Sequence, residues 1–149
     1  MAVDKLDFQN VVFHEFYHAF QQDLHDGGVC RERADMNEWQ QSIWFFEGAA
    51  HYFSTILLFE SNNRGSPINE ILRIASRVYA EGPDGINSQP DKWGAAALRL
   101  MIEKDLLAED TIIDGSLFHN CARELEYDST SSSMEHITNS WYLIEKDNS

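Results

Sequence analysis

The chain has 149 residues, a length typical of one domain, and 43% of them are hydrophobic, so the protein can bury a sizeable core. Its 25 acidic residues outnumber its 11 basic residues and give a formal net charge of −14, which argues against nucleic acid or an anionic membrane as a partner. No apolar stretch reaches the roughly 20 residues of a membrane span, and no basic-then-apolar signal peptide opens the chain.

The first predicted helix begins near Asp4 or Asp7, either of which can cap it, and ends at Gly27-Gly28. Apolar residues recur through this segment at the spacing of an α-helix. The aromatic residues among them can anchor the helix in a core and leave its histidine face free: Phe13, Phe16, Tyr17 and Phe20.

A second helix is predicted over about residues 36–59, with Asp35 and Glu38 forming a capping box at its start. Apolar residues lie almost all round the second half of this helix, which is typical of a buried helix. The small residues Gly48-Ala49-Ala50 in that half would let the backbone of another helix approach closely.

Four further helices are predicted over about 68–80, 91–107, 111–126 and from the Ser132 capping box to Ile144. Ser66 and Pro67 begin the first of these four, whereas Gly115 interrupts the third. No segment shows the sustained alternation of a strand. The sequence therefore predicts a mainly α-helical protein that forms a single domain.

Five consecutive residues of the first helix carry a metal-binding pattern, His14-Glu15-Phe16-Tyr17-His18. Because an α-helix has 3.6 residues per turn, His14 and His18 lie on the same face, where both imidazoles can bind one metal ion. Glu15 is rotated by about 100°, which makes it a poor third ligand but places it well to contact a water on the metal. This H-E-x-x-H arrangement is typical of zinc peptidases in which the glutamate is the general base.

Glu47 is a carboxylate in the most apolar part of the second helix. Its burial there is unfavourable unless it is paired or binds a metal. Together with His14 and His18 it would form a His2Glu zinc site with one position open for water, the pattern of catalytic zinc. We therefore expect one zinc ion per chain.

These two segments resemble the gluzincin class of zinc metallopeptidases. In that class an H-E-x-x-H helix is followed by a second helix with a W-x-x-E-G-x-A-x-Y pattern. This chain matches the second pattern at Trp44, Glu47, Gly48, Ala50 and Tyr52.

The resemblance implies a role for each motif residue. Glu47 would be the third zinc ligand, and Glu15 would take a proton from the attacking water and pass it to the leaving amine. The fold would be a zinc-binding helix pair, about 5–60, followed by a helical subdomain, about 67–146. The substrate would be a peptide or a protein.

Two features depart from the class. His18 and Glu47 are separated by 28 residues (47 − 18 − 1), more than in the thermolysin-like and aminopeptidase-like branches, so the branch stays undetermined. Gluzincins usually place a β-sheet before the first motif helix, whereas this chain has about six residues there. Either the sheet belongs to a longer parent protein, or the chain is a reduced homologue without it.

The group that would stabilise the developing oxyanion stays open among His51, Tyr52 and Tyr79. His51 lies one turn after Glu47, where it would orient a zinc ligand, meet the substrate or simply bond to a carbonyl group. The two tyrosines fit a core as well as a site, and Tyr17, although inside the motif, is expected to face the core.

The leading hypothesis is a zinc-dependent peptidase. A second hypothesis keeps zinc as a stabilising ion without catalysis, and a third treats the chain as a helical protein-interaction module without metal. Cys30 and Cys121 form neither a C-x-x-C pair nor a disulfide framework, and the sequence decides neither their pairing nor the oligomeric state or compartment.

Overall fold

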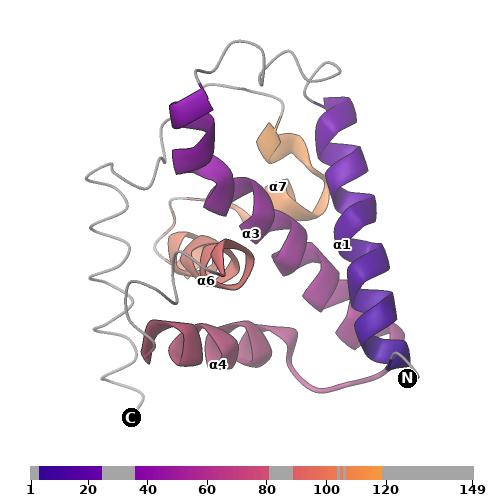
Figure 1. Cartoon of the computed structure of the whole chain (residues 1–149). Coiled ribbons are helices and arrows are strands. Elements are labelled where there is room, and N and C mark those ends of the chain that lie inside the picture. Colours follow the sequence, from indigo (N-terminus) through magenta and orange to yellow (C-terminus); the bar gives the residue numbers. More distant parts are fainter. Residues whose placement is uncertain (1–3, 25–35, 81–88, 104, 106, 119–149) are drawn as a thin grey trace.

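A computed structural model describes residues 4–24, 36–80, 89–103, 105 and 107–118. They form α1 (Lys5–Leu24), α3 (Met36–Ser61), α4 (Pro67–Ala80), α6 (Pro90–Glu103), α7 (Glu109–Ile113) and the 3₁₀ turn η1 (Ser116–Phe118) (Figure 1). No strand occurs among these residues, which confirms the prediction of a mainly α-helical fold. None of the described helices is long and apolar enough to cross a membrane.

Helix α3 is the centre of the described fold. It runs between α1 and α6 (Figure 1), and it also contacts α4 and α7. Ala49, Ala50 and Tyr52 of α3 are fully buried, which confirms the prediction that the second half of this helix is buried. The packing of α6 on α3 builds much of the core, and the packing of α1 on α3 forms the candidate site described below.

The closest approach of α3 and α6 involves two glycines. A Cβ atom added at Gly48 would lie 2.4 Å from the carbonyl carbon of Gly94 and 2.7 Å from its Cα atom. The alanines beside them, Ala49 and Ala95, are fully buried. The sequence predicted a close helix contact at Gly48 in connection with a shared metal site, but the partner there is α6 rather than the histidine-bearing α1.

Two helices are capped as the sequence predicted. The backbone N–H of Leu6 donates to Asp4 Oδ1 at 3.1 Å, so Asp4 caps α1. The backbone N–H of Asn69 donates to Ser66 Oγ at 3.2 Å, and Pro67 is the first residue of α4.

The helix predicted over 91–107 has different bounds. It is α6, which begins at Pro90 and ends at Glu103. Asp105 has a φ angle of 57°, a left-handed conformation through which an α-helix does not continue.

The helix predicted over 111–126 is not continuous. Helix α7 ends at Ile113, and Gly115 then adopts a φ angle of 75°, which turns the chain into η1. Glycine has no Cβ atom and therefore adopts this conformation at little steric cost.

Helix α1 buries only one side. Tyr17 is 1% exposed, as predicted, whereas Phe16 is 65% exposed and Phe20 is 36% exposed, so the prediction that these two phenylalanines anchor the helix in a core is wrong. Each residue rotates the helix by about 100°, and α3 and η1 contact the Tyr17 side. The open side also carries other exposed apolar residues: Phe8, Val11 and Val12.

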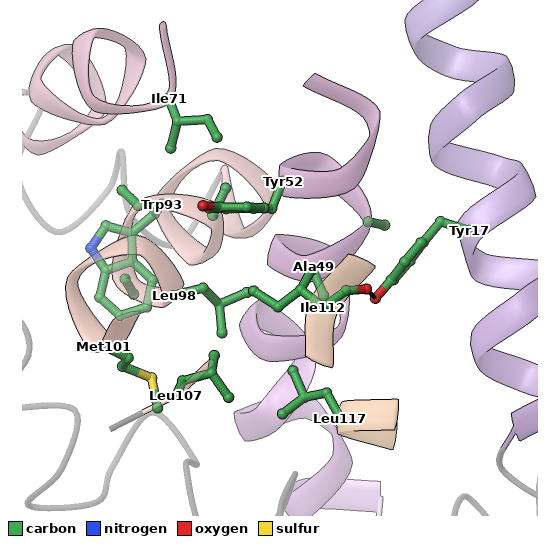
Figure 2. Close-up of a cluster of buried hydrophobic side chains, with 14 of the residues drawn as sticks. Tyr17, Ala49, Tyr52, Ile71, Trp93, Leu98, Met101, Leu107, Ile112 and Leu117 are labelled. Atoms are coloured by element: carbon green, nitrogen blue, oxygen red, sulfur yellow. Dashed lines mark hydrogen bonds between the residues drawn. The ribbon is translucent and has the colours of Figure 1, made fainter. Parts of the chain in front are cut away.

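The buried side chains of the core come from several helices (Figure 2). In this view Tyr17 points from α1 toward Ile112 of α7, and its hydroxyl donates a hydrogen bond to the Ile112 carbonyl oxygen. The bond joins the buried side of α1 to α7. His14 and His18 lie on the adjoining part of the helix surface and contact Glu47 of α3.

Several predictions fall outside the described residues. They include Gly27-Gly28 at the end of the first helix, Asp35 of the predicted capping box, the last helix up to Ile144, and the two cysteines Cys30 and Cys121.

Candidate metal centre

His14 and His18 of α1 and Glu47 of α3 converge where these two helices pack together. His14 Nε2 lies 3.0 Å from His18 Nε2, and Glu47 Oε2 lies 3.1 Å from each nitrogen. All three side chains are partly buried. Among the described residues, these three form the group of His, Cys, Asp and Glu side chains whose ligand atoms are close enough to hold one metal ion.

The triangle of these three ligand atoms has nearly the dimensions of a zinc site. A tetrahedral zinc ion about 2.0–2.2 Å from its ligands keeps neighbouring ligand atoms about 3.3–3.6 Å apart. The observed separations of 3.0 and 3.1 Å are slightly shorter, so a small outward movement of the side chains would admit the ion. Two imidazoles and one carboxylate are also ligands that zinc commonly takes. The residues therefore fit a divalent metal.

The three side chains change the pKa values of one another. Burial raises the pKa of Glu47, but hydrogen bonds with His14 and His18 outweigh burial and lower this pKa to about 2. Burial lowers the pKa of His18, but the hydrogen bond to Glu47 and the Glu47 charge outweigh burial, and the pKa rises. Glu47 is thus ionised throughout the neutral pH range and available as a ligand, whereas a protonated histidine must lose its proton before a metal binds.

Gln21 is a residue of this site that the sequence analysis missed. It is fully buried, its Oε1 lies 2.8 Å from His18 Nδ1, and its Nε2 donates to the backbone carbonyl of Phe46 at 3.0 Å. The Phe46 ring stacks on the His18 imidazole with centroids 4.9 Å apart. A signal was present in the sequence, because a residue three positions after His18 lies on the same side of the helix.

Glu15 is exposed on α1, one residue after His14. The helical rotation of about 100° per residue places its side chain beside the histidine pair rather than between the two rings. Glu15 does not belong to the group of converging ligand atoms. Its position is compatible with a group that acts next to a metal ion.

His51 is buried on α3, one turn after Glu47. Its ring centroid lies 6.5 Å from that of His14, and its Nδ1 lies 3.8 Å from Asp91 Oδ2 on α6. Its Nε2 is buried without a hydrogen-bond partner among the described residues. Burial lowers the pKa of His51 to about 4, although the charge of Asp91 acts in the opposite direction. His51 is therefore neutral near pH 7 and lies close to the metal centre without taking part in the triangle.

Of the two tyrosines proposed for the site, the structure describes the side chain of Tyr52 but not that of Tyr79. The Tyr52 hydroxyl donates to Glu109 Oε2, and Arg99 donates to the same carboxylate oxygen at 3.1 Å. These partly buried bonds join α3, α6 and α7 about 140° round α3 from Glu47. Tyr79 lies in α4, but its side chain is not among those described.

Comparisons with protein-family models, with curated proteins and with solved structures gave no match for this chain.

Proposed function

We propose that the protein is a zinc-dependent peptidase of gluzincin type that hydrolyses peptide bonds. The observation that carries this proposal is the convergence of His14 Nε2, His18 Nε2 and Glu47 Oε2 within 3.0–3.1 Å of one another, with the exposed Glu15 next to them on α1. The match of both sequence motifs to one class of zinc peptidases supports the same proposal.

His14, His18 and Glu47 would hold the zinc ion as three protein ligands, which leaves a fourth position open. A bound zinc ion supplies Lewis-acid chemistry, because it lowers the pKa of a coordinated water towards about 7. The three ligands carry one negative charge in total, from Glu47. The ionised state of Glu47 near pH 7 favours binding of a divalent cation.

Glu15 would act as the general base and then as the general acid. Its carboxylate accepts a proton from water as the water oxygen forms a bond to the peptide carbonyl carbon. It then gives this proton to the amide nitrogen as the C–N bond breaks, so that an amine and a carboxylic acid leave. The exposure of Glu15 allows a substrate to reach it.

The test of this proposal is the Glu15→Gln variant, which keeps the size of the side chain and removes the base. We expect the variant to bind as much zinc as the wild type and to lose at least about 100-fold in hydrolysis of fluorescently labelled casein. The matched control is Glu60→Gln, an exposed glutamate on α3, which is expected to change neither quantity.

The outcome also separates the alternatives. Zinc binding by the wild type without hydrolysis would support a domain that uses zinc for stability alone. A wild-type protein that binds no zinc would contradict the peptidase and favour a helical interaction module. Hydrolysis that survives in Glu15→Gln would exclude the proposed base.

A further inference from the structure

We propose that Gln21 is a positioning residue that holds His18 in the tautomer required for metal binding. The inference rests on the proposed metal site, and it concerns a side chain that neither sequence motif includes. Gln21 is fully buried on α1, so no water competes for its amide group. Both ends of that amide have protein partners, His18 on the same helix and the Phe46 carbonyl on α3.

The Phe46 carbonyl fixes which way the Gln21 amide points. A backbone carbonyl oxygen only accepts hydrogen bonds, so the Gln21 group 3.0 Å from it must be the NH2 group. The other end of the amide, 2.8 Å from His18 Nδ1, is therefore the oxygen Oε1. A flipped amide would place two acceptors against each other at Phe46.

The orientation of the amide decides which nitrogen of His18 carries the proton. Because Oε1 only accepts, it favours the tautomer in which His18 Nδ1 carries the hydrogen and donates it. In the neutral imidazole the remaining nitrogen, Nε2, then has a free lone pair. That nitrogen is the one that lies 3.0 Å from His14 Nε2 and 3.1 Å from Glu47 Oε2. Gln21 thus favours a lone pair on the His18 nitrogen that faces the triangle, whereas the Glu47 carboxylate favours a proton on that nitrogen when no metal ion is bound.

Gln21 and Phe46 also connect His18 to the part of α3 that carries Glu47, the third ligand. Phe46 immediately precedes Glu47 on α3, its carbonyl holds the Gln21 amide, and its ring stacks on His18. His18 is therefore held on one edge by Gln21 and on one face by Phe46. Partners of metal ligands that hold the ligand orientation commonly contribute a factor of roughly 10 to 100 to metal affinity.

The first test reads the tautomer directly in metal-free protein. In a Glu47→Ala background, which removes the carboxylate that competes for the proton, ¹⁵N NMR of the imidazole nitrogens at alkaline pH is expected to show His18 protonated at Nδ1, with its signals assigned by their loss in His18→Gln. The Gln21 variants are compared in the same background. In Gln21→Met, which has a similar length and no acceptor, we expect a mixture of the two tautomers. In Gln21→Glu, which keeps an acceptor oxygen for Nδ1 but loses the N–H donor to the Phe46 carbonyl, we expect the Nδ1 proton to be retained.

The second test measures zinc affinity by competition with a chelator. Gln21→Met is expected to weaken zinc binding by roughly 10- to 100-fold, and Gln21→Glu by less. The control is Gln9→Met, because Gln9 Oε1 accepts a bond at 3.1 Å from Asn62 and so links α1 to the residue that follows the end of α3. We expect no change of tautomer or affinity in this control, and circular dichroism verifies that each variant is folded.

The results separate this inference from the function proposed above. An Nδ1 proton that persists in Gln21→Met, or an equal loss of affinity in Gln9→Met, would overturn the role of Gln21 and leave the metal site standing. A wild-type protein that binds no zinc would overturn the proposed function, and the tautomer comparison in metal-free protein would still decide the role of Gln21.

Discussion

His51 shows how burial changes the protonation of a single side chain next to the candidate metal centre. Its pKa is about 4 in the folded protein, mainly because burial disfavours the charged form, against about 6.5 in an unfolded chain. Between these two pH values the unfolded state binds a proton that the folded state does not bind. The free energy of unfolding therefore falls as the pH is lowered from about 6.5 to about 4.

We predict that this pH dependence is weaker in His51→Gln, which has no titratable group at that position. In metal-free wild-type protein the contribution of His51 has a slope of at most about 1.4 kcal/mol per pH unit. Glu47 and His18 titrate in both proteins, so the difference between the two curves reports on His51 together with its interactions with Asp91 and His14. Urea unfolding in the presence of a chelator, followed by circular dichroism between pH 4 and 7 in steps of about half a unit, measures both curves. Two parallel curves would contradict the burial of a neutral His51.

Individual residues of the candidate site differ in how far the sequence could predict them. His14 and His18 follow from helical spacing alone, and Glu47 stands out because a carboxylate is costly in an apolar helix. Gln21 was missed because glutamine is common on helix surfaces, and its value depends on the carbonyl of Phe46, which only the packing of α3 brings near.

At the scale of helices, the contact of α3 with α6 sets the geometry of the core. Gly48 and Gly94 lie so close that a methyl group between them would meet backbone atoms, which cannot rotate away as a side chain can. The two helix axes would have to separate for the methyl group to fit. Separation would loosen the buried alanines on both helices.

We predict that Gly48→Ala destabilises the protein by about 1–3 kcal/mol, although alanine normally favours a helix. The control is Gly65→Ala, since a Cβ atom at Gly65 meets no other atom within 4 Å. This control is expected to be neutral or slightly stabilising. Urea unfolding of both variants gives the comparison. Equal stabilities of the two variants would show that the close helix approach does not exist.

The sequence predicted where the helices occur better than it predicted where each helix ends or which of its sides is buried. Periodic apolar residues predicted all four longer helices, and the caps at Asp4 and Ser66 were correct. The ends near Asp105 and Gly115 depend on single residues with positive φ angles. The buried side of α1 depends on where α3 packs, so the exposure of Phe16 did not follow from the sequence of α1 itself.

At the scale of the whole molecule, the candidate metal centre joins two helices far apart in the sequence. In the described structure α1 contacts mainly α3, with a smaller contact to η1. A metal ion held by His14, His18 and Glu47 would bridge α1 and α3. Because such an ion binds the folded state, it would stabilise the protein by about 2.7 kcal/mol at a free concentration 100 times the Kd.

The decisive measurement is the zinc content of the purified protein, wild type beside Glu47→Ala, after incubation with zinc and removal of the excess. We expect about one zinc per chain in the wild type. In Glu47→Ala we expect a much smaller content, because the ligand from α3 is lost. Glu60→Ala, which removes an exposed carboxylate from the same helix, is expected to bind zinc like the wild type. A wild type without zinc, or a Glu47→Ala variant with as much zinc as the wild type, would contradict the metal centre.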